Sequence, residues 1–305
     1  KWQAHTNSIF DLCWADDDRR VLTASGDQTC RLWNVETRAC ENVFVGHTGS
    51  VKTVRAKPAE TSVFASGSRD GTVMLWDTRL PCEQKRADLR YRNALRKHAS
   101  IRVSSRPDVM KKTRQGRLRN RPSDIVTCVL FLKDPNLLAT AGCATGLVAR
   151  SKLCFSRGCV RCSVIKVWDL RKISTYLPKP NTSDNHGITS LSLHPMHGSE
   201  LIASCTDNRI YQYNLNHPDE AMRTFSGHLN GSFYVKSSYS PDGRFVASGS
   251  TDRTVHIWDA TDAKQHTLLS GHAAEVNVVD WCTNEFGKIA SCSDDGTVRV
   301  WSVRR

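Results

Sequence analysis

A pattern that recurs along the 305-residue chain constrains its fold more than any other feature. Each copy has an apolar pair, small residues, an Asp-containing turn and an alternating apolar stretch that ends in an aromatic residue. The aromatic ends are Trp33, Trp76, Trp168, Tyr213, Trp258 and Trp301, spaced by 43, 92, 45, 45 and 43 residues. Period-2 alternation on both sides of a tight turn is typical of two antiparallel strands. The sequence therefore predicts an all-β chain built from tandem hairpins.

The period and an upstream Gly-His pair together resemble WD repeats, each of which supplies four strands to a propeller blade. The pairs are Gly46-His47, Gly227-His228 and Gly271-His272. The resemblance implies one WD-repeat β-propeller over residues 1–305, with six repeats visible. Because a propeller closes by pairing its last edge strand, we expect a seven-bladed parent whose N-terminal part is incomplete here.

Composition is consistent with a large core and a reducing compartment. The chain is 39% hydrophobic, and it contains no apolar run of the roughly 20 residues that a membrane-spanning helix needs. Most of the twelve cysteines stand singly inside apolar stretches, as reduced core residues do. We therefore expect no membrane association and a location in the nucleus or cytoplasm.

A Ser-His-Asp set in the second repeat, Ser66, His47 and Asp70, suggests a catalytic triad when it is taken alone. Equivalent residues recur in three other repeats, whereas an enzyme needs only one nucleophile. The resemblance to WD repeats instead implies a structural network in which each loop His bonds the turn Asp and a hydroxyl, completed by the strand Trp. Its predicted members are His5, Thr23, Asp27, Trp33, His47, Ser66, Asp70, His228, Ser248, Asp252, Trp258, His272, Ser291, Asp295 and Trp301.

Two repeats end in Trp-Asp-x-Arg, namely Trp76-Asp77-x-Arg79 and Trp168-Asp169-x-Arg171. The planar guanidinium of Arg suits bidentate docking onto a partner, although an Arg on a solvated loop is the simpler alternative. These ends resemble the motif by which propeller receptors dock on DNA-damage-binding protein 1, the adaptor of cullin-4 ubiquitin ligases. The resemblance assigns Trp76, Asp77, Arg79, Trp168, Asp169 and Arg171 to adaptor binding.

Longer stretches resemble the denticleless type of WD-repeat protein. They read "AHTNSIFDLCW", "SGDQT", "GHLNGSFYVKSSYSPDGRF" and "EVNVVDWCTNEFGKIASCSDD". This resemblance implies a nuclear, non-catalytic receptor without cofactor or metal, which brings substrates bound to the sliding clamp to a cullin-4 ligase in S phase and after DNA damage. The alternative is a generic WD-repeat scaffold in a nuclear chromatin-associated complex.

Two segments interrupt the repeats. Residues 83–121 hold fourteen Lys and Arg against three acids, which is compatible with a solvated loop, a nuclear-import patch or weak contact with DNA phosphates. Residues 147–163 form a Cys-rich insertion at a predicted hairpin tip. This insertion is interpreted as a surface loop, as an unremoved intron in the gene model, or as a zinc site that uses Cys143, Cys154, Cys159 and Cys162.

Overall fold

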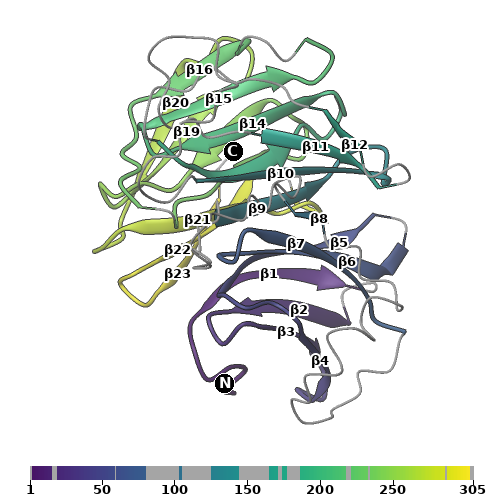
Figure 1. The fold of residues 1–305 in the computed structure, drawn as a ribbon. Coiled ribbons are helices and arrows are strands. Elements are labelled where there is room, and N and C mark those ends of the chain that lie inside the picture. Colours follow the sequence, from purple (N-terminus) through teal and green to yellow (C-terminus); the bar gives the residue numbers. More distant parts are fainter. Residues whose placement is uncertain are drawn as a thin grey trace, which may run out of the picture. The chain divides into compact units, whose positions relative to one another are not determined.

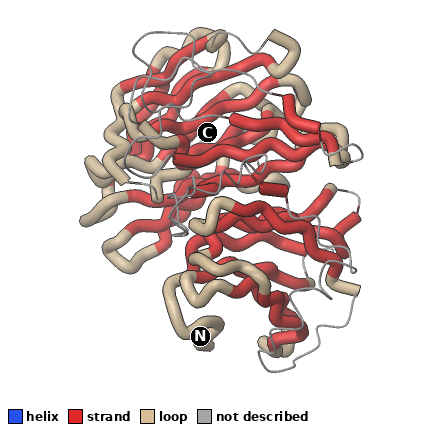
Figure 2. The backbone as a smooth tube through the Cα atoms, in the orientation of Figure 1, coloured by secondary structure: helices blue, strands red, loops and turns tan. Residues whose placement is uncertain are grey.

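Strands and loops make up all of the chain that the computed structural model describes (Figure 2). The described residues are 2–15, 19–58, 60–79, 103–104, 125–143, 165–170, 174–176, 186–217, 221–232, 234–285 and 287–302. The prediction of an all-β chain is confirmed over these ranges. They contain no helix that could cross a membrane.

The described residues divide into two compact units, one up to Phe131 and one from Leu132 onward. The first unit holds two antiparallel sheets of four strands in chain order, and the strand β9 (Figure 1). Its strands are β1 (Ile9–Ala15), β2 (Arg20–Ser25), β3 (Thr29–Asn34), β4 (Cys40–Val45), β5 (Val51–Lys57), β6 (Glu60–Ser68), β7 (Thr72–Asp77), β8 (Val103–Ser104) and β9 (Ile125–Phe131).

The second unit continues the same arrangement (Figure 1). The strands β10, β11 and β12 are successive neighbours, followed by two four-stranded sheets and a three-stranded one. Their bounds are β10 (Leu137–Cys143), β11 (Ile165–Asp169), β12 (Ser174–Tyr176), β13 (Ile188–Leu193), β14 (Glu200–Cys205), β15 (Arg209–Asn214), β16 (Arg223–Ser226), β17 (Ser237–Tyr239), β18 (Phe245–Ser248), β19 (Thr254–Asp259), β20 (Gln265–Ser270), β21 (Val276–Trp281), β22 (Lys288–Ser293) and β23 (Val298–Ser302).

Strand pairing in every repeat follows the sequence pattern. The aromatic residue that ends the pattern lies opposite an apolar residue of the preceding strand. The pairs are Val21 with Trp33, Phe64 with Trp76, Leu138 with Trp168, Leu201 with Tyr213, Val246 with Trp258, and Ile289 with Trp301. A slip of one residue would move every side chain to the other face of its sheet, so the hydrophobic alternation sets this register.

The hydrophobic core lies between successive sheets of each unit. In the first unit β1, β5 and β9 are neighbours, as are β13, β17 and β21 in the second. Phe44 and Phe64 meet edge to face at 4.8 Å between ring centroids, and Trp76 stacks on Phe64 at 6.1 Å. A single repeat cannot bury its own apolar faces, so each sheet depends on the next one for its core.

The turn after each Asp needs a left-handed residue. Positive φ angles near 70° occur at the residue that directly follows the Asp, at Gln28, Gly71, Asn208, Arg253 and Gly296. Glycine adopts this conformation without a steric penalty, whereas a side chain at Gln28 or Arg253 is strained there. The turn geometry is thus common to repeats that differ in the residue they place in it.

The two predicted insertions lie mostly outside the described residues. Within 83–121 only β8 is described, and it pairs with β7 as Thr72 to Ser104 and Val73 to Val103. Residues 147–163 lie entirely outside the described part, so the alternatives for the Cys-rich segment stay predictions.

Candidate functional site

A buried hydrogen-bond network closes the second repeat. His47 Nδ1 lies 3.1 Å from Asp70 Oδ2, and His47 Nε2 lies 2.7 Å from Ser66 Oγ. The indole N–H of Trp76 donates to the same Ser66 oxygen at 2.8 Å. Burial alone would raise the pKa of Asp70, but hydrogen bonds from His47, Thr72 and the backbone outweigh it and hold this pKa well below its usual range. The His, Ser, Asp and Trp side chains therefore act as one interlocked unit.

The first and sixth repeats contain the same arrangement. His5 lies 2.8 Å from Asp27 and 2.7 Å from Thr23, and Trp33 donates to Thr23 at 3.1 Å. In the sixth repeat His272 bonds Asp295 and Ser291, and Trp301 donates to Ser291, each at 2.8 Å. Three copies of one geometry leave no Ser that is distinguished as a nucleophile. They stabilise the blades, because a buried hydrogen bond contributes about 1 kcal/mol and more when one partner is charged.

The fifth repeat departs from the predicted network. Neither ring nitrogen of the buried His228 has a hydrogen-bond partner among the described residues. Asp252 instead lies 2.8 Å from His256 Nε2, and Ser248 donates to the Gly249 carbonyl at 2.9 Å. Trp258 donates to the Ser226 carbonyl at 3.0 Å rather than to a hydroxyl. The expected contacts of His228 are thus not formed, and His256, four residues beyond Asp252 on the next strand, bonds the carboxylate instead.

The electrostatics of His228 follow from this isolation. Burial, together with the smaller effect of the neighbouring His256, lowers the pKa of its imidazole to about 4. The His228 and His256 ring centroids lie 6.2 Å apart, and both rings pack against Trp258. His228 is consequently a neutral core residue at physiological pH.

The third and fourth repeats retain parts of the network. In the third, Trp168 donates to Thr140 Oγ1 at 2.9 Å. In the fourth, Ala203 replaces the hydroxyl residue, and the Tyr211 hydroxyl donates to Asp207 Oδ2 at 2.6 Å. Tyr211 stands at the position that His256 occupies in the fifth repeat, so a polar side chain there captures the turn Asp in both. A His or Tyr two residues before the final aromatic of a repeat is thus a sequence signal for this bond, and the predicted network did not include it.

No metal-binding group stands out. The described residues contain no cluster of three or more His, Cys, Asp or Glu side chains that could hold an ion. Three of the four Cys residues considered for zinc, Cys154, Cys159 and Cys162, lie outside the described part, as does the side chain of Cys143.

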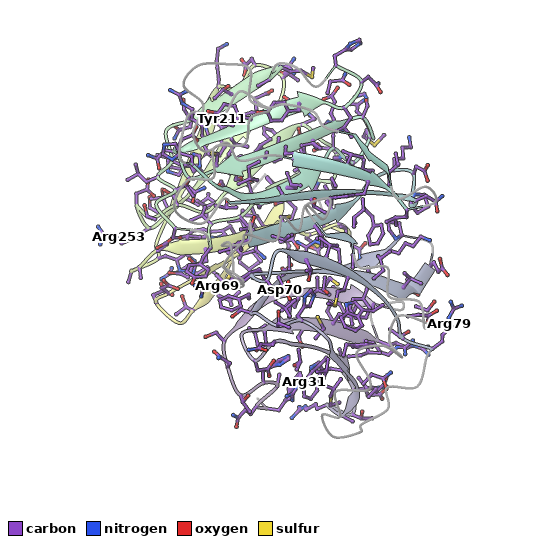
Figure 3. All side chains as sticks on the ribbon, in the orientation of Figure 1. Arg31, Arg69, Asp70, Arg79, Tyr211 and Arg253 are labelled. Atoms are coloured by element: carbon purple, nitrogen blue, oxygen red, sulfur yellow. The ribbon has the colours of Figure 1, made fainter. Side chains whose placement is uncertain are left out.

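The first Trp-Asp-x-Arg end presents an oriented guanidinium. The Arg79 side chain is 63% exposed, and its Nε and Nη2 donate to the Asp77 carboxylate at 2.9 and 2.6 Å. Hydrogen bonds from Arg79 hold the pKa of Asp77 below its usual range. Glu60 lies 3.5 Å from Arg79 Nη2. Since β6 and β7 are antiparallel, Arg79 lies at the end of this hairpin opposite Arg69 in the turn (Figure 3).

The second such end is described only in part. Trp168 is buried and pairs with Leu138, and the amide of Leu170 donates to the Asn136 carbonyl at 2.8 Å. Arg171 and the side chain of Asp169 lie outside the described residues. Their assignment to adaptor binding therefore stays a prediction.

The loop before β17 is a surface that the repeat pattern does not predict. Leu229 and Tyr234 are 49% and 50% exposed, whereas Asn230 and Val235 of the same loop are fully buried. Asn230 donates to the Cys205 carbonyl at 3.0 Å, and Ser232 donates to Glu275. These anchors hold the loop against the fourth and sixth sheets and leave two large side chains facing solvent.

Comparisons with known proteins agree with the repeat architecture. The family model described as "WD domain, G-beta repeat" matches residues 1–34, 38–77, 219–259 and 263–302. Residues 78–218, which the family model does not match, contain the third and fourth repeats, in which the His, Asp, hydroxyl and Trp network is incomplete.

Curated relatives match the whole chain. It is 39% identical over 318 residues to the Denticleless protein homolog of Danio rerio, 37% identical over 321 residues to that of Homo sapiens, and 33% identical over 318 residues to Protein lethal(2)denticleless of Drosophila melanogaster. These alignments cover 99–100% of the chain but 46%, 41% and 39% of the three relatives. The chain thus spans less than half the length of the relatives it matches.

Proposed function

Because the chain belongs to the WD-repeat family and is a denticleless-type β-propeller chain, we propose that it is a nuclear, non-catalytic substrate receptor of a cullin-4 ubiquitin ligase. It docks on DNA-damage-binding protein 1 and recruits proteins bound to the sliding clamp. Ubiquitination then follows from proximity, since a substrate lysine held near a charged conjugating enzyme has a high effective concentration.

The geometry of Arg79 is the observation that carries the proposal. An exposed Arg normally loses side-chain entropy when a partner immobilises it. Here Asp77 accepts from two guanidinium nitrogens of Arg79 and orients the group before any partner arrives. The equivalent position of the fifth repeat holds Thr261, which bonds Asp259 and carries no charge. A pre-oriented cation at the end of only some repeats suits specific docking better than general solvation.

Substrate contact is assigned to the loop before β17. Large side chains on a backbone fixed at several points lose little entropy on binding, and Tyr is enriched in interface cores. Leu229 and Tyr234 both meet the first condition, and Tyr234 meets the second as well. The loop lies at the turn end of its sheet, because Thr251 of the β18–β19 turn donates to the Leu229 carbonyl at 2.9 Å.

Binding of purified DNA-damage-binding protein 1 to the chain tests the proposal. We expect Arg79→Ala to weaken binding about tenfold and Arg79→Ala with Arg171→Ala to abolish it in a titration, because each removes a bidentate charged donor. Tyr234→Ala is the control and should leave adaptor affinity unchanged. Undiminished binding by the double Arg variant would show that the docking assignment is mistaken.

A further inference from the structure

The loop between β13 and β14 presents an apolar side chain at the end of the second unit where β11 also ends. Met196 in this loop is 66% exposed, and its neighbours Pro195 and His197 are exposed too. Solitary exposed apolar side chains are common on protein surfaces and need no explanation by themselves. Met196 differs because of where it lies and how its backbone is held.

A chain of contacts connects this loop to the second Trp-Asp-x-Arg end. The amide of Leu170, directly after β11, donates to the carbonyl of Asn136 at 2.8 Å. Lys133 lies in the same short loop as Asn136 and packs against Gly198. A Cβ built on Gly198 would lie 2.6 Å from Lys133 Cβ, which is fixed to its own backbone, so a larger residue would push the two loops apart. The Met196 loop therefore adjoins the loop that bonds the end of β11.

A buried histidine fixes the backbone of Met196. The ring Nδ1 of His194 accepts hydrogen bonds from the amides of Met196 at 3.2 Å and His197 at 3.0 Å. The same ring packs edge to face on Tyr239 with centroids 4.9 Å apart. It also fills the space over Gly243, where an added Cβ would lie 2.3 Å from His194 Cε1. The loop is held by groups from the next sheet, so binding through it orders little additional backbone.

We propose that Met196 is an apolar anchor for the cullin-4 adaptor, beside the Trp-Asp-x-Arg contact. The inference rests on the proposed function and adds a residue that the motif does not contain. Its partner surface would place an apolar pocket beside the part that receives the end of β11. Methionine suits such a pocket because its unbranched thioether adapts to irregular surfaces, and it is enriched in interface cores.

Titration of the purified adaptor into the full chain tests the inference. Met196→Ser should weaken binding about tenfold, because it removes the apolar contact from a surface residue without disturbing the fold. Met196→Leu should stay within about twofold of the unaltered chain, since it preserves the buried area. Val298→Ser is the matched control, because Val298 is an apolar residue of similar exposure (70%) that follows the β22–β23 turn, and this variant should bind like the unaltered chain.

The outcomes separate the inference from the proposed function. If Arg79→Ala weakens binding while Met196→Ser does not, the anchor role is overturned and the receptor role stands. If the unaltered chain does not bind the adaptor, both are overturned. A loss with Met196→Ser that Met196→Leu restores and Val298→Ser does not share supports the anchor.

Discussion

The second and fifth repeats share a sequence pattern but differ in their hydrogen bonds. In the second, His47 links Asp70 to Ser66, and both ring nitrogens are satisfied. In the fifth, the equivalent His228 is as deeply buried yet has no partner among the described residues. The two repeats also differ at the fourth position after the turn Asp: Met74 of the second repeat cannot bond the carboxylate, whereas His256 of the fifth does.

The comparison shows that a shared motif does not guarantee a shared network. The outer carboxylate oxygen of a turn Asp can accept from more than one donor, because in the first repeat Asp27 Oδ2 lies 2.8 Å from His5 Nδ1 and 3.4 Å from Arg31 Nη2. His256 lies four residues from Asp252 across a tight turn, while His228 approaches from a loop 24 residues earlier in the chain. In the fourth repeat the Tyr211 hydroxyl likewise donates to Asp207. A donor four residues after the turn Asp therefore accompanies the loop His in the first repeat and stands in its place in the fifth.

Replacing the loop histidine of each repeat should give the largest difference between the two repeats in the free energy of unfolding. His47→Leu removes hydrogen bonds to a buried carboxylate and a buried hydroxyl, so we expect the free energy of unfolding to fall by about 4 kcal/mol. His228→Leu removes no hydrogen bond and should change it by less than about 1 kcal/mol. Urea unfolding of each variant at pH 7 measures both values. Equal losses would mean that His228 has a bonding role that the structure does not contain.

The pH dependence of stability should isolate His228. Its pKa is lowered from 6.5 to about 4 by burial, so the unfolded chain binds its proton at a higher pH than the folded chain. The contribution of neutral His228 to the free energy of unfolding is therefore fully present above about pH 6.5. It falls by up to about 3 kcal/mol as the pH decreases toward 4.

Urea unfolding at pH 7, 6 and 5 measures this slope, and His228→Leu should flatten it. The depressed pKa values of Asp27, Asp70, Asp252 and Asp295 act in a separate window, because carboxylate stabilisation is lost only below their usual value of 3.8. A slope between pH 6.5 and 4 that persists in His228→Leu would assign the effect to another group.

Exchanging the residues that follow the turn Asp should give the smallest change in the free energy of unfolding. Gly71 and Arg253 occupy equivalent left-handed positions, with φ angles of 76° and 72°. Gly71→Arg should lower the free energy of unfolding by about 1 kcal/mol, and Arg253→Gly should raise it by up to the same amount. Thermal unfolding midpoints of both variants provide the measurement. Shifts in the same direction would indicate that side-chain contacts, rather than φ, dominate at this position.

The sequence predicted the strands, turns and register well because these depend on neighbours along the chain. The alternation that ends in Trp76 or Trp258 places the same pairs opposite each other as the structure does. The candidate site was less predictable. Arg79 was identified from its motif, but its orientation by Asp77 emerges only from side-chain positions. Met196 belongs to no sequence motif, so the sequence alone does not single it out.

The sequence by itself determined the repeat, its hairpins and the residues available for each network. Only the tertiary structure decided which donor Asp252 accepts, and that Gly198 meets Lys133 of the preceding repeat. The physical reason is that strand alternation and turn geometry are local properties, whereas hydrogen-bond choice and loop contacts depend on groups that folding brings together from distant parts of the chain.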